Sequence, residues 1–366
     1  MNEDQSKKDG AESGASGNTK PVNFRSKFVW TVIFFAVAAL SVYAVTEQSK
    51  SFSLASFVDF IENASLPWLL AALASMLGFI VFEALAILCI CNAFGYKIGF
   101  GKYFCYSASD IYFSAITPSA SGGQPACAYF MINDGIPGTV VTAALITNLA
   151  MYALSIIIIG AVSFIICPSS VTHFGTVPQI LIYVGIAIQI GLIIFFVMLL
   201  KKPAVPKAIC AWFIRMLSKI KLLRDPEKAL GKLDALTEEY ADYSARMVGK
   251  KAMIVKVLFF NLLQRASQIA VTMFTFLATG GDPSLASEIF SIQSCVVLGT
   301  NCIPVPGAMG VTDYFMLDAF GSIMSEQGAV DLELLSRSLS FYVCVLICGL
   351  AVLIKYFSQR KRSAIK

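Results

Sequence analysis

Charged residues and histidine are scarce in this chain. Asp, Glu, Lys and Arg make up 14% of its 366 residues, whereas soluble domains carry roughly 25%. Histidine occurs once, as His173, so neither histidine catalysis nor a histidine-rich metal site is expected. The ten cysteines include no Cys-x-x-Cys pair and are expected to act mostly as small hydrophobic residues. Because the sequence contains no P-loop, dinucleotide-binding fingerprint or nucleic-acid module, we expect no cofactor and no nucleic-acid partner.

Apolar residues, in contrast, are abundant. They make up 57% of the chain, and the mean hydropathy is +0.73. Several apolar runs approach or exceed the roughly 18–20 residues with which a helix crosses a bilayer. These runs are residues 28–45, 66–91, 140–167, 180–200, 255–278 and 339–357. The sequence therefore predicts an all-α polytopic membrane protein with about six full spans.

The basic residues are distributed unevenly between the loops. If the N-terminus is cytoplasmic, 25 of the 28 Lys and Arg residues fall in segments on the inside. This predicts a multi-pass protein of a bacterial-type plasma membrane with both termini in the cytoplasm. Residues 1–24 are polar and rich in Ser and Gly, which predicts a disordered cytoplasmic tail. Residues 25–357 would form the transmembrane domain, and residues 358–366 a basic cytoplasmic tail.

Two segments rich in proline and glycine interrupt the apolar sequence, at residues 116–125 and 302–310. Non-helical backbone at membrane depth survives only where protein buries it or where it lines a watery cavity. A matched pair of such interruptions, one in each half of a chain, is typical of the substrate sites of transporters. We therefore expect a substrate site where the two segments meet.

The helical arms that precede the interruptions are short. Residues 103–116 and 288–302 would form helices of about 15 residues, or roughly 22 Å, which cannot cross a core of about 30 Å. With the cytoplasmic N-terminus, this predicts re-entrant segments at residues 103–137 and 285–330, which enter from opposite faces in an inverted-repeat arrangement. The alternative is a pair of kinked ordinary hairpins without common ancestry.

The segment 203–250 is rich in basic residues and is expected to be a cytoplasmic amphipathic loop. Apolar residues around Trp212 recur on one helical face while Arg215 falls elsewhere, the pattern of a basic helix that lies on anionic headgroups. Asp225 followed by Pro226 predicts the start of a second helix. The segment either contacts lipid headgroups or is a linker hairpin packed on the helix bundle.

Four ionisable residues lie within apolar stretches, namely Glu83, Asp110, Arg265 and Asp313. A charge at the bilayer centre costs about 2.5–3.5 kcal/mol on insertion scales, so such residues are candidates for a substrate site. Arg265 belongs to a polar stripe at helical spacing that should face the bundle interior. The stripe consists of Asn261, Gln264, Arg265, Gln268 and Thr272. Two alternatives are hydrogen bonding between helices with Arg265 snorkelling, and a structural pairing of Arg265 with Glu83.

The two interruptions also carry candidate binding residues. In the first, hydroxyl and amide side chains accompany Gly122 and Gly123, whose exposed backbone N–H groups at a helix start suit an anion such as phosphate. Its polar side chains are those of Ser119, Ser121 and Gln124. The second interruption contributes Asn301, Pro304, Pro306, Gly307 and Gly310. Asp313 follows in the first turn of the next helix, where it could equally cap the helix dipole.

At these residues the chain resembles the lysylphosphatidylglycerol synthase transmembrane-region family, a flippase-like group. The resemblance rests on residues 117–125 followed by Asp134-Gly135-Ile136, and on Pro304-Val305-Pro306-Gly307 with Gly310 and an acid at position 313. It covers nearly the whole chain, from about residue 24 to residue 357. In the second segment Ala308 stands where many relatives carry a second glycine, and Asp313 stands where glutamate is commoner.

The resemblance implies a phospholipid or lipid-linked substrate. In full-length relatives this region translocates lysyl-phosphatidylglycerol between leaflets, which links it to membrane lipid metabolism and resistance to cationic antimicrobial peptides. A separate soluble domain in those relatives transfers lysine from lysyl-tRNA to phosphatidylglycerol. Because residues 358–366 are too few to fold, we expect that domain to be absent here and a lysyltransferase label to be inherited from the family name.

We therefore expect a translocase for lysyl-phosphatidylglycerol or a related anionic phospholipid, and not an enzyme. A membrane-embedded transferase with a lipid substrate is one alternative, for which Glu83, Asp110 or Asp313 would supply the reactive acid. A small-solute secondary transporter is the other alternative. The expected partners are a phospholipid and the membrane itself, and a homo-oligomer or a separate lipid-modifying transferase stays open.

Overall fold

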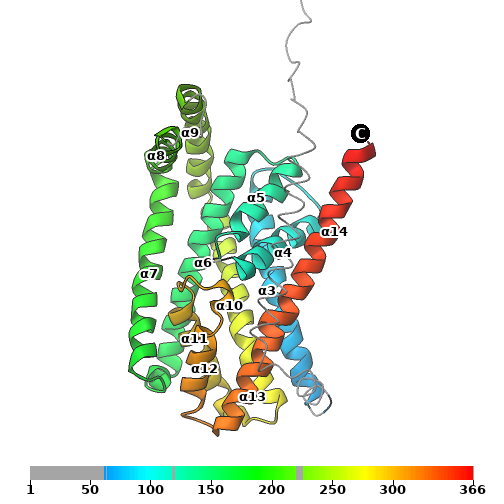
Figure 1. Ribbon diagram of the computed structural model, residues 1–366, viewed down its shortest axis with the longest axis vertical. Helices are drawn as coiled ribbons and strands as arrows, with labels where there is room; N and C mark the ends of the chain where they lie inside the picture. The colour runs from blue at the N-terminus through cyan, green and yellow to red at the C-terminus, as the bar shows by residue number, and fades with distance from the viewer. Residues whose placement is uncertain (1–61, 63, 118–119, 220–225, 366) are drawn as a thin grey trace, which may run out of the picture. The chain divides into compact units, whose positions relative to one another are not determined.

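The computed structural model describes residues 62, 64–117, 120–219 and 226–365, which fall in one compact unit, Ser49–Lys366. All regular elements in these ranges are helical (Figure 1). The long and medium helices are α3 (Leu66–Ala93), α4 (Phe100–Ile116), α5 (Gly123–Asn133), α6 (Gly138–Ile166), α7 (Thr176–Lys201), α8 (Ala204–Lys219), α9 (Pro226–Gly249), α10 (Lys251–Ala278), α11 (Ala286–Thr300), α12 (Val311–Phe320), α13 (Glu326–Arg337) and α14 (Cys344–Ile365). Short helical turns are η3 (Pro168–Val171), η4 (Pro283–Leu285), η5 (Pro306–Ala308) and the π-helical η6 (Ser338–Val343).

Five helical stretches among the described residues are long and apolar enough to cross a membrane. They are Leu66–Ala93, Gly138–Ile166, Thr176–Lys201, Lys251–Ala278 and Glu326–Ser358. Large apolar side chains such as Ile165, Ile180 and Leu346 are exposed on their surfaces, as expected of helices that face lipid. The chain is therefore a helical multi-pass membrane protein. These five stretches match five of the predicted spans, and the predicted span at residues 28–45 lies outside the described residues.

Helices α3 and α10 form the central pair of the bundle and pack along each other. Gly78 of α3 faces α10 so closely that a β-carbon there would lie 3.0 Å from Ser267 Oγ. Small residues at such contacts allow helices in membranes to approach each other. The buried side chains of Met76 and Val271 belong to the hydrophobic cluster that fills this part of the bundle. This pair therefore positions the polar residues of both helices inside the protein.

Both predicted interruptions separate pairs of short helices. Helix α4 has 17 residues and packs against α5, and α11 has 15 residues and packs against α12. Helix α4 also packs against η5 in the second interruption. The two broken segments, far apart in the sequence, are therefore neighbours in the structure.

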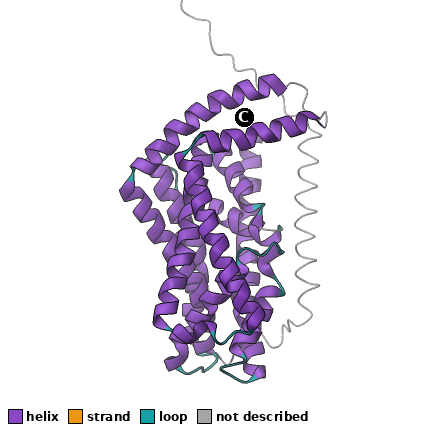
Figure 2. Cartoon of the chain, turned by 90° about the vertical axis from the view of Figure 1, so that its left-hand side faces the viewer, coloured by secondary structure: helices purple, strands orange, loops and turns teal. Residues whose placement is uncertain are grey.

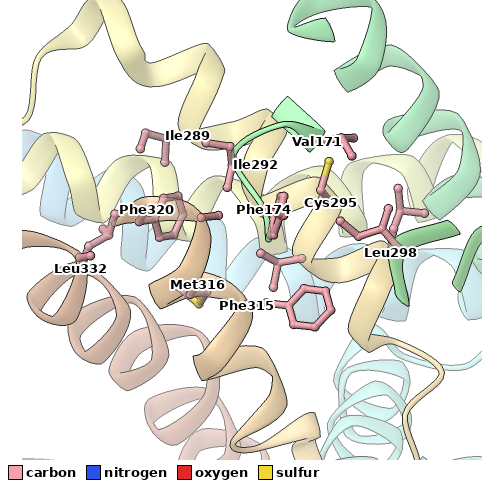
Figure 3. Packing of buried hydrophobic residues seen from close by; sticks show 14 of the residues in the cluster. Val171, Phe174, Ile289, Ile292, Cys295, Leu298, Phe315, Met316, Phe320 and Leu332 are labelled. Atoms are coloured by element: carbon pink, nitrogen blue, oxygen red, sulfur yellow. The ribbon is translucent and has the colours of Figure 1, made fainter. Parts of the chain in front are cut away.

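A hydrophobic cluster packs α11 and α12 against the rest of the bundle (Figure 3). Phe315 of α12 and Leu298 of α11 are buried in it together with Phe174. Leu298 lies against two glycines of neighbouring helices, Gly160 of α6 and Gly185 of α7. These glycines provide the space into which α11 fits.

Replacing Gly185 with alanine is expected to destabilise the protein by about 3 kcal/mol, the upper range for overpacking. A β-carbon at this position would lie 2.0 Å from the backbone oxygen of Leu298, so α7 and α11 would have to separate. Thermal unfolding in detergent measures the effect. Gly191→Ala is the matched control, because a β-carbon at Gly191 of the same helix meets no atom within 4 Å. Equal melting temperatures for both variants would contradict the close packing of these helices.

Helices α8 and α9 occupy the segment that was predicted to be an amphipathic loop (Figure 2). Helix α9 packs against α6 and α7. Thr139 Oγ1 donates a hydrogen bond to Glu239 Oε1 at 2.8 Å, and the Tyr240 hydroxyl donates to the Leu199 carbonyl at 3.1 Å. Burial raises the pKa of Tyr240 to about 12, so its hydroxyl keeps the proton that it donates. The segment is therefore packed on the bundle through α9, and the predicted cap residue Asp225 lies outside the described residues.

Candidate substrate-binding site

The first interruption is closed by a threonine. Helix α4 ends at Ile116, and Thr117 Oγ1 accepts a hydrogen bond from the Gly122 N–H at 2.9 Å while it donates to the Phe113 carbonyl at 2.6 Å. The chain turns through Ala120, which has a positive φ of 52°, and α5 begins at Gly123. Of the predicted polar residues, Ser121 is exposed and Ser119 lies outside the described residues.

Asp110 joins the two helices on either side of this interruption. Its Oδ2 accepts a hydrogen bond from Gln124 Nε2 at 2.6 Å, and its Oδ1 accepts one from Ser114 Oγ at 3.3 Å. Gly123 is buried directly against it, and a β-carbon there would lie 2.1 Å from Asp110 Oδ1. Asp110 itself is 8% exposed. The described residues on both sides of the interruption thus pack around a buried acid.

Glu83 of α3 lies beside Asp110 and is 4% exposed. Its Oε2 accepts hydrogen bonds from Ser107 Oγ and from Gln264 Nε2, both at 3.1 Å. Ser107 and Asp110 are one turn apart on α4, so the carboxyl group of Glu83, which bonds to Ser107, lies beside that of Asp110. We call Glu83, Ser107, Asp110, Gln124 and Gln264 the carboxyl cluster. It connects four elements, α3, α4, α5 and α10, inside the bundle.

Arg265 follows Gln264 on α10 and is 4% exposed, so protein covers it and it does not snorkel. Its guanidinium lies 4.1 Å from the centre of the Tyr152 ring and 5.5 Å from that of Phe79, and it donates a hydrogen bond to Gln268 Oε1. Such cation–π contacts stabilise a cation by about 0.5–2 kcal/mol. No ion pair within 4.0 Å joins Arg265 to a carboxylate among the described residues, and its Nε is buried without a hydrogen-bond partner there. The alternative of a direct Arg265–Glu83 ion pair is therefore not realised in this structure.

The second interruption is linked to Arg265 through Tyr152. The Tyr152 hydroxyl donates a hydrogen bond to Asn301 Oδ1 at 2.9 Å, immediately after α11 ends. The backbone then turns through Gly307 and Gly310, whose φ values of 59° and 75° favour glycine. Between them Ala308 also has a positive φ, of 48°. Pro304 is exposed and Pro306 begins η5.

Asp313 has a separate set of partners. Its Oδ2 accepts a hydrogen bond from the Gly310 N–H at 2.8 Å, and its Oδ1 lies 2.9 Å from Arg337 Nε in an ion pair. The aspartate thus caps α12, which is the alternative that its position in the first helical turn suggested. Its ion pair also ties α12 to α13.

The rest of the polar stripe bonds to neighbouring helices. Asn261 Nδ2 donates to Asn148 Oδ1 at 3.0 Å, and the Thr272 and Ser336 hydroxyls are 2.6 Å apart. All members except Gln268 are buried, as the helical spacing predicts. The predicted alternative of hydrogen bonding between helices therefore holds for Asn261 and Thr272 at the two ends of the stripe. Arg265, near the middle of the stripe, instead contacts two aromatic rings and the Gln268 amide.

The structure brings some of the predicted substrate-binding residues together in one place. The residues that lie in or directly beside the carboxyl cluster and Arg265 are Glu83, Asp110, Gly122, Gly123, Gln124, Gln268 and Asn301. Asp313 and Gly310 are held instead by each other and by Arg337.

Sequence reasoning missed several residues of the site. Ser107 and Ser114 stand three residues before and four residues after Asp110, so helical spacing could have found them on its face. Tyr152 lies in an apolar span and gives no such signal. Arg337 becomes visible as a partner of Asp313 only in the folded chain.

The sequence profile of one protein family, described as the lysylphosphatidylglycerol synthase TM region, matches residues 28–348. The matched range contains both interruptions, the carboxyl cluster and Arg265. No curated protein matches the chain.

Proposed function

The chain belongs to the lysylphosphatidylglycerol synthase TM region family, and from this premise we propose that it translocates an anionic or lysyl-modified phospholipid between membrane leaflets. Lysyl-phosphatidylglycerol or a related lipid is the substrate class that the family description suggests. Moving lysyl-modified lipid to the outer leaflet would lower the negative surface charge that attracts cationic antimicrobial peptides.

Arg265 is the observation that carries this proposal. A buried arginine in a membrane protein is costly unless an anion or a polar surrounding compensates it. Here two rings and one amide surround the guanidinium, and no ion pair joins it to a described carboxylate. Arginine binds phosphate through a planar fork of donors. We infer that Arg265 receives the headgroup phosphate, with Gln268 and Tyr152 orienting its guanidinium.

The interruptions support a path for the headgroup. Helix ends have backbone N–H and C=O groups without partners inside the helix, and such groups require polar partners or water in a membrane. Tyr152 connects Arg265 to the second interruption, and α4 connects the first interruption to η5. We propose that both interruptions are re-entrant segments, related as inverted repeats, and that the headgroup passes between them.

The proposed topology has six spans in a plasma membrane, with both termini in the cytoplasm. Single-cysteine labelling in a background without the ten native cysteines tests it. A cysteine at Lys232 of α9 should react with a membrane-impermeant reagent only from the inside, and one at Gly328 of α13 only from the outside. The reason is the inside excess of Lys and Arg under this orientation. Labelling of Lys232 from the outside would contradict the topology and the inverted repeat.

Translocation itself can be measured with purified protein in liposomes. Phosphatidylglycerol with a fluorescent acyl chain is placed in both leaflets, and dithionite destroys the fluorophore in the outer leaflet. Liposomes with the protein should lose nearly all fluorescence, whereas empty liposomes should lose about half. Loss of only half with correctly inserted protein, for both phosphatidylglycerol and lysyl-phosphatidylglycerol, would contradict the proposed function.

A further inference from the structure

The two acids of the carboxyl cluster are neighbours inside the bundle. Glu83 and Asp110 are both buried, and their carboxyl groups lie side by side, because Ser107, which bonds to Glu83, stands one helical turn from Asp110. Two ionised carboxylates are acceptors only, so neither can bond to the other until one of them is protonated. Two like charges placed side by side inside the protein also disfavour ionisation of both groups. Both arguments indicate that the pair shares one proton.

The charges around the pair are consistent with one shared proton. The ionisable groups that face it are Arg265 of α10, Tyr152 of α6, Cys127 of α5 and Cys348 of α14. Tyrosine and cysteine side chains are ordinarily neutral near neutral pH, which leaves Arg265 as the one charged neighbour in that set. With one shared proton, the two acids carry a single negative charge that balances Arg265. Without the proton, the buried group would carry an uncompensated negative charge, which is costly in a membrane.

The remaining hydrogen bonds hold the acids in place without supplying a second cation. Gln124 donates its amide to Asp110, while Ser107 and Gln264 donate to Glu83. The Oε1 atoms of Gln124 and Gln264 are buried without a hydrogen-bond partner among the described residues. An additional acidic proton on either carboxyl group would therefore find an unused acceptor close by.

We propose that Glu83 and Asp110 form a proton-binding pair that couples lipid translocation to a proton gradient. Uptake of the second proton neutralises both acids, so that Glu83, Asp110 and Arg265 together carry a net positive charge. This charge attracts the headgroup phosphate to Arg265. Release of that proton restores neutrality and favours release of the headgroup. One proton and one singly charged anionic headgroup thus move together without net charge. The coupling rests on the proposed translocation, whereas the sharing of a proton does not.

Infrared spectroscopy of the purified protein in lipid tests the shared proton directly. Near neutral pH the wild type should show a carbonyl band from a buried carboxylic acid. Both Glu83→Gln and Asp110→Asn should lose the part of this band that the pair contributes, because the remaining acid then ionises beside Arg265. Buried Glu333, which lies beside Asp313, should keep its own contribution in both variants. Glu238→Gln, at an exposed position on α9, is the matched control and should keep the full band. Persistence of the full band in either variant would overturn the shared proton.

Transport by the wild type tests the coupling and needs no variant. In liposomes with a gradient of about one pH unit and the membrane potential clamped, fluorescent phosphatidylglycerol should become unequally distributed by up to about tenfold per coupled proton. An equal distribution with rapid exchange would overturn the coupling while leaving translocation intact. Absence of exchange with or without the gradient would instead count against the proposed function, and the infrared result would then stand by itself.

Discussion

Replacing Arg265 with glutamine is expected to slow translocation of phosphatidylglycerol on the order of 100-fold, while the protein still folds. Hydrogen bonds to a charged group contribute about 1.5–3 kcal/mol each, and about 2.7 kcal/mol corresponds to 100-fold. Glutamine keeps a polar amide beside Gln268 but removes the fixed charge that would attract the phosphate. The liposome assay measures the rate, and thermal unfolding measures the stability.

Two further variants calibrate this result. Arg265→Lys should retain part of the activity, on the order of a tenth, because lysine keeps the charge and loses the planar fork. Lys256→Gln removes a cation from an exposed position of the same helix and should leave translocation unchanged. If activity fell equally in Lys256→Gln, a general loss of positive charge would explain the effect and the proposed role of Arg265 would fail.

A structural role for Arg265 predicts a different pattern. If the positive charge of Arg265 mainly stabilises ionised Glu83, Arg265→Gln should lower the free energy of unfolding by about 3–5 kcal/mol. Adding Glu83→Gln should then restore the stability. Recovery of both stability and translocation in the double variant would make the two residues a structural pair. Recovery of stability alone would keep Arg265 in the substrate path.

Hydropathy predicts most of this fold because a bilayer imposes helix length. The apolar runs located five stretches to within a few residues at most of their ends, since each run must cover the hydrocarbon core. The last stretch is the exception and begins at Glu326, well before the predicted start at residue 339. Ser325 caps α13 by accepting a hydrogen bond from the Gly328 N–H, and the π-helical η6 then continues the helix into α14. Hydropathy cannot detect this extension, because α13 is amphipathic and not uniformly apolar.

The candidate site was only partly predictable. Glu83, Asp110 and Arg265 stand out in the sequence because ionisable residues are rare in apolar stretches. Their partners depend on helix packing, and Gln264 meets Glu83 across 181 positions of the chain. The sequence offered Glu83 as an ion-pair partner for Arg265, whereas in the structure Glu83 bonds to Ser107 and Gln264 and Arg265 lies against aromatic rings. The spacing of residues along one helix cannot show which side chains of a neighbouring helix they contact.

Replacing Gly123 with alanine is the other change with a large expected effect. A β-carbon at Gly123 would lie 2.0 Å from Ser114 Oγ, 2.1 Å from Asp110 Oδ1 and 2.5 Å from the Asp110 backbone oxygen. Since backbone atoms of α4 cannot yield as a side chain would, α4 and α5 must separate and the Gln124–Asp110 hydrogen bond must lengthen. We expect a loss of about 2 kcal/mol of stability from overpacking. By analogy with enzyme sites, where displacement by about 1 Å can cost on the order of 100-fold, translocation should fall by a similar factor.

Close packing, and not a left-handed backbone, is the reason for this expectation. Among the described residues of the first interruption, the positive φ lies at Ala120, while Gly122 has a φ of −82°. Gly101 of α4 serves as the matched control, because a β-carbon there meets no atom within 4 Å. Gly101→Ala should fold as well as the wild type or slightly better, since alanine favours the helix. Translocation at the wild-type rate in Gly123→Ala would show that the contact between Gly123 and Asp110 is not needed for the headgroup path.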